Sequence, residues 1–300
     1  MTRHLRRAAL LAVLLVTVAA LVSGAVAYRN ADKLLRPPDR LTAAADQDNP
    51  MRTLGIGFRN VRVASPLGPM PAWLVPGRRR TWVIAVHGMW APRAEALPVV
   101  KDAHRLGFPL LVISYRNDPG APASPDGLSH LGASEWHDLD AATAFALAHG
   151  ARRFVLVGYS MGGTIVCNFL HSSPRAHDAA GVILDSPVLD WGSTLDRLAA
   201  AADTPAALTG LTSRVIAWRI GASLSSLDEL SHPGDLHVPT LILEGARDTI
   251  ASPEQGKALA AARPGLVRLV EFAGAGHADA WRVAPGRYRQ AVDWLLTSVA

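Results

Sequence analysis

The sequence predicts a doubly wound α/β domain with a mostly parallel β-sheet and a small helical lid, preceded by an N-terminal transmembrane helix. Along residues 53–300, short apolar runs alternate with helical patterns. The runs are apolar throughout, as expected when helices cover both faces of a parallel sheet. An uncharged stretch at residues 8–28 predicts the preceding helix.

The N-terminal stretch has the length and flanks of a membrane anchor. Residues 8–28 carry no charged side chain. About twenty residues at ~1.5 Å each span the ~30 Å core of a bilayer. Arg3, Arg6 and Arg7 precede the stretch, and such a basic cluster keeps its end cytoplasmic. We therefore predict a signal anchor at residues 1–28 of a cell-membrane protein whose domain at residues 53–300 is extracytoplasmic.

A cleaved signal peptide is the alternative. Ala25-Val26-Ala27 is an A-x-A site, so cleavage near Ala27 would release a secreted protein. The helical pattern can continue through Tyr28–Leu35 until Pro37-Pro38 stops it, which favours the anchor. Residues 29–52 are polar and contain proline, and we interpret them as a linker.

The elements of the domain, residues 53–300, follow in order. Phe58–Ala64 and Met70–Val75 read as a hairpin around Pro66-Leu67-Gly68. Ser134 is the expected N-cap of a helix that Gly150 terminates. Further strands are predicted over Trp82–Val86, Leu110–Tyr115, Phe154–Val157, Gly181–Leu184, Thr240–Leu243 and Leu266–Phe272, and helices over Ala94–Leu106, Ser134–His149 and residues 285–298.

One block, residues 191–237, breaks the alternation. It contains two helical patterns, at about 193–202 and 206–221, between two predicted strands. An insertion at this point lies over the carboxyl ends of the strands, where ligands bind in open α/β sheets. We interpret the block as a small lid.

Charge and cysteine content exclude several function classes. Three of the positive charges behind the formal net charge of +5 belong to Arg3, Arg6 and Arg7, which precede the uncharged stretch. No stripe of Lys and Arg with interleaved aromatics is present, so nucleic acid is not an expected partner. Cys167 is the single cysteine, which precludes an intrachain disulfide, and we interpret it as a small buried apolar residue. No Cys/His cluster has metal-ligand spacing, and we expect neither a metal nor a cofactor.

Gly158-Tyr159-Ser160-Met161-Gly162 is a G-x-S-x-G motif between a predicted strand and a predicted helix. A serine in that setting sits on a sharp, strained turn with its hydroxyl raised clear of the sheet. Side chains at Gly158 and Gly162 would collide with the neighbouring helix and strand. Ser160 is therefore the candidate nucleophile.

A serine nucleophile needs a base to take its proton and a carboxylate to hold that base. His277 follows the last predicted strand in a glycine-rich loop and is the candidate base. Asp248 follows the strand before it and is the candidate acid. Asp185 also follows a strand directly and remains the rival acid. The order Ser, Asp, His is the one found in this type of fold.

The negative charge that develops on the substrate oxygen also needs donors. One candidate is the backbone N–H of Met161, directly after the nucleophile. The second is the backbone N–H of Met89, in the loop after the Trp82–Val86 strand. His87 precedes the nucleophile in the chain, and we interpret it as a residue that shapes this loop.

In combination, His87-Gly88, the Ser160 motif, Gly245-Ala246-Arg247-Asp248 and Gly276-His277 resemble the α/β-hydrolase superfamily. The resemblance covers about residues 54–300. Within the superfamily the chain looks like the bacterial membrane-anchored or exported hydrolases near the prolyl-oligopeptidase-like and ABHD-type branch. The resemblance implies the roles of nucleophile, base and acid for Ser160, His277 and Asp248. The chain lacks the HGGG oxyanion loop and the propeller of true prolyl oligopeptidases.

These observations predict a serine hydrolase that cleaves ester-type bonds of a small-molecule acyl substrate through an acyl-enzyme on Ser160. A peptidase, a thioesterase or a cofactor-free haloperoxidase with the same residues is an alternative. A membrane-tethered binding protein with this fold and no activity is another. The acyl group is determined by the pocket and lid rather than by the motif.

Overall fold

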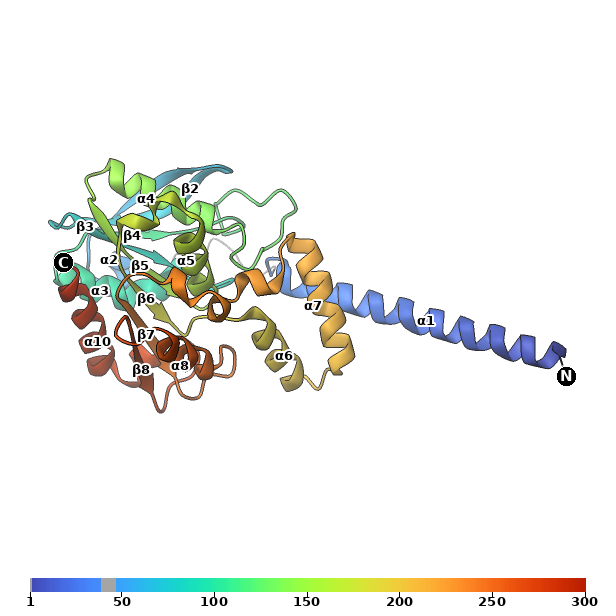
Figure 1. Ribbon diagram of the computed structural model, residues 1–300. Helices are drawn as coiled ribbons and strands as arrows, with labels where there is room; N and C mark the ends of the chain where they lie inside the picture. The colour runs from blue at the N-terminus through green and yellow to red at the C-terminus, as the bar shows by residue number, and fades with distance from the viewer. Residues whose placement is uncertain (1, 39–46) are drawn as a thin grey trace.

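The computed structural model describes residues 2–38 and 47–300. Within them, eight strands form one twisted sheet in the order β1-β2-β4-β3-β5-β6-β7-β8 (Figure 1). The hairpin strands are antiparallel, and so is the β2–β4 pair; all other pairs are parallel. The strands are β1 Arg59–Ser65, β2 Gly68–Val75, β3 Thr81–Val86, β4 Leu110–Ile113, β5 Arg153–Tyr159, β6 Ala179–Asp185, β7 Thr240–Gly245 and β8 Val267–Phe272.

Helices cover both faces of the sheet, which explains why its parallel strands are apolar throughout. Ile84 and Leu156 point into one core, whereas their neighbours Val83 and Val155 point into the other. The elements around the sheet are α2 Pro50–Leu54, η2 Arg93–Ala96, α3 Leu97–Arg105, α4 Trp136–Ala148, α5 Met161–Ser172, η3 Pro174–Asp178, α8 Pro253–Ala262, α9 Ala280–Val283 and α10 Pro285–Ser298.

The predicted doubly wound fold is confirmed, with differences at some helix ends. The hairpin and the closing helix over residues 285–298 form as predicted. The prediction that Ser134 caps α4 is wrong: Glu135 occupies the N-cap position, and the Ser134 hydroxyl bonds His130 instead. The helix α8 was not predicted.

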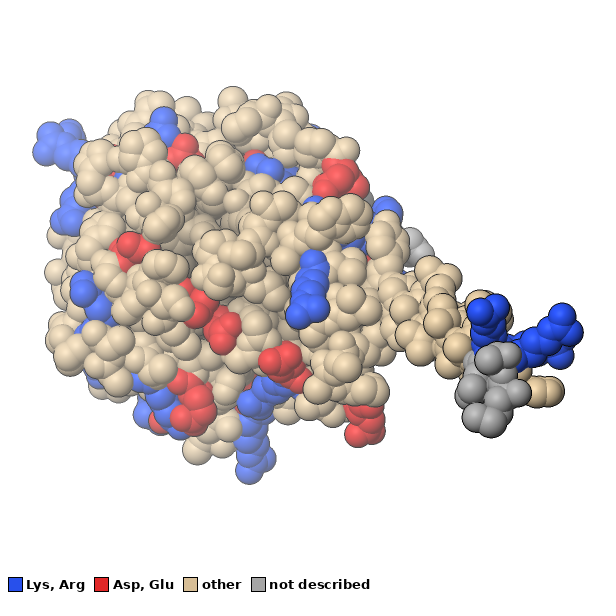
Figure 2. Space-filling view, turned by 45° about the vertical axis from the view of Figure 1, so that its right-hand side comes forward, with Lys and Arg blue, Asp and Glu red and all other residues tan. Residues whose placement is uncertain are grey.

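The N-terminal helix α1, Thr2–Leu35, projects away from the body of the molecule (Figure 1). Its stretch from Arg6 to Leu35 is long and apolar enough to cross a membrane. Figure 2 shows basic side chains at its far end and an uncharged surface between them and the body. The helix passes residue 28, so residues 29–35 of the expected linker are helical; residues 39–46 lie outside the described residues.

The block at residues 191–237 forms two helices and three short turns between β6 and β7. The helix α7 packs across the end of α1 (Figure 1). Trp191, Thr194 and Leu198 of α6 line the same cavity as Ser160, which places α6 over the carboxyl ends of the strands. The elements are α6 Trp191–Ala201, α7 Ala206–Ile220, η4 Leu224–Leu227, η5 Glu229–Ser231 and η6 Pro233–Asp235.

Candidate active site

Ser160 stands between the end of β5 and the start of α5 in a strained backbone conformation. Its φ of 49° and ψ of −118° are unusual for a residue with a Cβ. Besides the bond from the Gly163 N–H in the first turn of α5, two backbone hydrogen bonds hold it there. The Ser160 N–H donates to the Asp185 carbonyl over 3.0 Å, and the Val188 N–H donates to the Ser160 carbonyl over 3.1 Å. The turn is therefore fixed by the segment that leaves β6.

The two glycines of the motif allow the turn to pack closely. A Cβ on Gly158 would lie 2.4 Å from the Gly162 carbonyl oxygen, at the start of α5. A Cβ on Gly162 would lie 2.4 Å from the Val86 carbonyl oxygen, at the end of β3. These are the collisions with helix and strand that the sequence predicts, so no larger residue fits at either position.

Asp248 and His277 are joined by a hydrogen bond. The His277 Nδ1–H donates to Asp248 Oδ2 over 2.7 Å. The other carboxylate oxygen accepts from the Ile250 N–H, also over 2.7 Å. The Asp248 side chain is fully buried, whereas that of His277 is 19% exposed. This arrangement fixes the imidazole tautomer and leaves Nε2 free of the carboxylate.

Asp185, the rival acid, has different partners. Its Oδ2 accepts a hydrogen bond from the Tyr288 hydroxyl over 2.9 Å. Ser186 donates to its other oxygen over a long 3.4 Å. Burial raises the pKa of Asp185 to about 7, and the Tyr288 hydrogen bond only partly offsets it. The Asp185 side chain, at the carboxyl end of β6, is therefore bound by Tyr288 of α10.

Ser160, His277 and Met89 line one cavity of about 190 Å³. Met161 is buried at the first position of α5, where the backbone N–H groups and the positive end of the helix favour negative charge. The structure therefore brings the predicted nucleophile, base and both oxyanion donors to the carboxyl edge of the sheet. Asp248 is hydrogen-bonded to His277 and is not among the residues that line the cavity.

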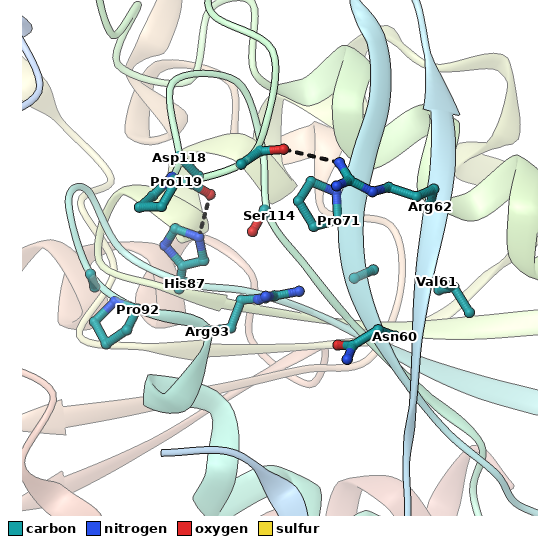
Figure 3. Close-up of a pocket in the computed structure, with 13 residues that line it drawn as sticks. Asn60, Val61, Arg62, Pro71, His87, Pro92, Arg93, Ser114, Asp118 and Pro119 are labelled. Carbon is teal, nitrogen blue, oxygen red and sulfur yellow. Dashed lines mark hydrogen bonds and ion pairs between the residues drawn. The ribbon is translucent and has the colours of Figure 1, made fainter. Parts of the chain in front are cut away.

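His87, in the loop after β3, and Asp118 form a buried pair. Each ring nitrogen faces an acceptor: Nδ1 lies 2.8 Å from the Gly88 carbonyl oxygen, and Nε2 lies 2.8 Å from Asp118 Oδ2. Burial disfavours the charged ring, but the Asp118 carboxylate, together with the Gly88 carbonyl and Glu95, outweighs burial and raises the pKa of His87. The pair lines a second cavity, of about 370 Å³, that contains none of the three predicted triad residues (Figure 3).

Two further residues position the site and were not predicted. Glu95 Oε2 accepts the Gly88 N–H over 2.7 Å and lines the cavity with Ser160. Burial raises the pKa of Glu95, although the Gly88 N–H works against it. The Ser186 hydroxyl accepts the N–H of Ala278, next to His277, over 3.0 Å. Only Ser186 had a sequence signal, since it directly follows the β6 strand.

Glu244, on β7 just before the Asp248 loop, gives a stability prediction. It is buried, and neither carboxylate oxygen has a hydrogen-bond partner among the described residues. Burial, followed by the nearby Asp248, raises its pKa to about 9. Between pH 5 and 9 the unfolded chain is ionised at this position while the folded chain keeps its proton, so stability falls as pH rises.

We therefore expect Glu244→Gln to increase the free energy of unfolding by on the order of 2 kcal/mol at pH 8. The gain should shrink to nothing near pH 4, where both states of the wild type are protonated. Urea denaturation at a series of pH values measures it. Glu254→Gln, exposed on α8, is the control and should change little. A gain that is the same at pH 4 and pH 8 would contradict the prediction.

Comparison with known proteins establishes the family. A family model described as "Alpha/beta hydrolase family" matches residues 83–291. The chain belongs to the alpha/beta hydrolase family. Among curated proteins none matches the sequence. The residues of this family member that the structure describes contain no group of three or more His, Cys, Asp or Glu side chains that could hold a metal ion.

Solved structures share the hydrolase fold at low sequence identity. An esterase of Pyrococcus furiosus has a TM-score of 0.68 and 19% identity, covering 89% of this chain and 98% of its own. An esterase of Thermogutta terrifontis has a TM-score of 0.56 and 20% identity, covering 81% and 99%. A puromycin-hydrolyzing peptidase of Mycobacterium tuberculosis has a TM-score of 0.61 and 17% identity, but the match covers 82% of this chain and only 40% of the peptidase.

Proposed function

We propose that the chain is a serine hydrolase that cleaves ester-type bonds through an acyl-enzyme on Ser160. The observation that carries the proposal is the Asp248–His277 hydrogen bond beside a cavity that contains Ser160. A buried carboxylate that orients an imidazole next to a strained serine is the arrangement needed to activate a hydroxyl. The fold, shared with esterases and a peptidase, is compatible with hydrolysis.

In this mechanism the Ser160 hydroxyl attacks the carbonyl carbon of the ester, and His277 Nε2 takes the hydroxyl proton. Asp248 holds the Nδ1–H and stabilises the imidazolium that forms. The N–H groups of Met161 and Met89 stabilise the negative oxygen of the tetrahedral intermediate. His277 then protonates the leaving alcohol. Water, deprotonated by the same imidazole, releases the acid and restores Ser160.

The proposed location is the cell membrane, with α1 as a single-pass anchor and the catalytic domain outside the cytoplasm. The apolar length of α1 and the arginines at its far end support this orientation (Figure 2). Within the family we place the chain near the membrane-anchored, prolyl-oligopeptidase-like branch, on the motifs of its sequence. The Ser160 cavity, of about 190 Å³, has room for the ester group of a small-molecule acyl substrate and the first carbons of its chain.

The test is labelling of the full-length protein, in detergent, with a fluorophosphonate probe. We expect one adduct, located by mass spectrometry on the peptide that contains Ser160. Turnover of p-nitrophenyl butyrate is then compared with that of a butyryl thioester and a butyryl p-nitroanilide, with the ester expected to be fastest. Failure of the folded protein to label would support a binding protein instead. A faster amide or thioester would change the bond but keep the nucleophile.

A further inference from the structure

The C-terminal end of the anchor helix is part of the candidate active site. Leu34, in its last turn, lines the cavity that contains Ser160, Met89 and His277. The Leu34 carbonyl accepts a hydrogen bond from the Trp90 indole Nε1–H over 3.3 Å. Trp90 directly follows Met89 and has a left-handed φ of 57°. The anchor therefore contacts both the wall of the cavity and the loop that carries the proposed oxyanion donor.

The same end of α1 holds the lid helix α7. Ala27, Ala31 and Leu35 are fully buried, at the four-residue spacing of one helix face. Arg219 of α7 donates to Asp32 over 2.7 Å. Its guanidinium also lies over the ring of Tyr28, 4.7 Å from the centroid. In Figure 1, α7 crosses α1, so it would lie along a membrane that α1 spans.

The number of α1 residues between the uncharged stretch and Leu34 gives the distance between the cavity and the bilayer. The uncharged stretch ends at residue 28, and Leu34 is six residues further along. At 1.5 Å per residue, the cavity wall is about 9 Å beyond the hydrocarbon edge, close to the thickness of one headgroup layer. Aromatic side chains are typical of this depth. Tyr28 is exposed at the end of the uncharged stretch. On α7, Trp218 is 74% exposed and directly precedes Arg219, which contacts Tyr28 and Asp32 of α1.

The cavity itself is small. At about 190 Å³ it is below the roughly 300–1,000 Å³ of pockets that enclose a whole drug-sized ligand. It can hold an ester group and the first carbons of a chain. The rest of a longer chain must leave past the residues that line the cavity. Leu34 of α1 and Leu198 of α6 are two of these residues, and two others, Glu95 and His277, also line a larger cavity of about 1370 Å³. An apolar chain that leaves beside the anchor stays near the bilayer.

We infer that the substrates are long-chain acyl esters that reside in the membrane, taken up where α1 and the lid meet the bilayer surface. The inference rests on the proposed ester hydrolysis and adds the source of the substrate. The acyl group passes from the ester to Ser160 Oγ, the alcohol leaves with a proton from His277, and water releases the fatty acid. Trp218 belongs to the surface that contacts the membrane and does not touch the reacting atoms.

The test uses the full-length protein in phosphatidylcholine vesicles. One substrate is 4-methylumbelliferyl palmitate dissolved in the same bilayer, and the other is water-soluble p-nitrophenyl butyrate. We expect the wild type to hydrolyse both. Trp218→Glu should lower the palmitate rate about tenfold, because a charge replaces an interfacial aromatic ring, and should leave the butyrate rate unchanged. Trp294→Glu, 39% exposed on α10 and remote from α1, is the matched control and should affect neither rate.

The outcomes separate the two proposals. A wild type that hydrolyses butyrate but not the bilayer ester overturns the inference and leaves the proposed function intact. Equal palmitate rates for the wild type and Trp218→Glu also overturn it, as does an equal loss on both substrates. A wild type inactive on both substrates and unreactive with fluorophosphonate overturns the proposed function itself. Loss of the palmitate rate alone in Trp218→Glu supports the inference.

Discussion

Replacing Ser160 with alanine is expected to lower kcat for p-nitrophenyl butyrate by at least about ten-thousand-fold and to abolish fluorophosphonate labelling. The substitution removes only the hydroxyl oxygen. The backbone hydrogen bonds to Asp185 and from Val188 do not involve the side chain, so the turn should persist. Measuring kcat and the melting temperature of both proteins in parallel separates lost chemistry from lost structure.

Ser186→Ala is the matched comparison for this substitution. Ser186 also has a positive φ, of 47°, but it is fully buried, whereas Ser160 is half-buried. The Ser186 hydroxyl accepts a hydrogen bond from the Ala278 N–H and donates to Asp185 over a long 3.4 Å. Loss of the Ser186 hydroxyl should move the His277 loop slightly. It should lower kcat by no more than about tenfold, which corresponds to the net free energy of about one hydrogen bond. If Ser160→Ala keeps the wild-type rate, Ser160 is not the nucleophile.

Asp248→Asn is expected to lower kcat by about ten-thousand-fold, because an amide no longer holds the His277 Nδ1–H and favours the wrong imidazole tautomer. Asp185→Asn is expected to cost less than about tenfold. Its amide oxygen can still accept the Tyr288 hydroxyl, and Asp185 makes no hydrogen bond to His277 among the described residues.

Steady-state kinetics of the two asparagine variants, with melting temperatures as a check on folding, decides between the two acids. The expected pattern is a large loss of kcat at position 248 with little change in KM. A larger loss at position 185 would assign the role of acid to the residue after β6. The structure would then have to move His277 away from Asp248 on binding substrate.

The sheet is predictable because its central strands are buried on both faces, and such strands appear in a sequence as short apolar runs. The ends of helices are harder to predict from the sequence. Ser134 has the residue type of a cap, yet Glu135 occupies the N-cap position and makes no side-chain capping bond. Its carboxylate instead accepts the N–H groups of His130 and Gly132 in the preceding loop. That competition depends on how the preceding loop folds, and residue types alone do not describe it.

The candidate site is predictable where chain order and strand ends determine it. Ser160, Asp248 and His277 each stand just past a strand, and the parallel sheet brings those ends to one edge. Leu34 and Glu95 have no such signal. The Leu34–Trp90 hydrogen bond joins residues 56 positions apart, from a segment that the sequence presents only as an anchor and linker. Contacts of that kind arise from tertiary packing.

The attachment of the Ser160 turn to the segment after β6 has a consequence for the growing chain. The Ser160 turn cannot have all of its backbone hydrogen bonds before residue 188 has been synthesised, because Asp185 and Val188 supply two of them. The proposed acid and base belong to the last part of the chain. The proposed hydrolysis therefore requires that Asp248 and His277 have been synthesised and have folded beside the Ser160 turn.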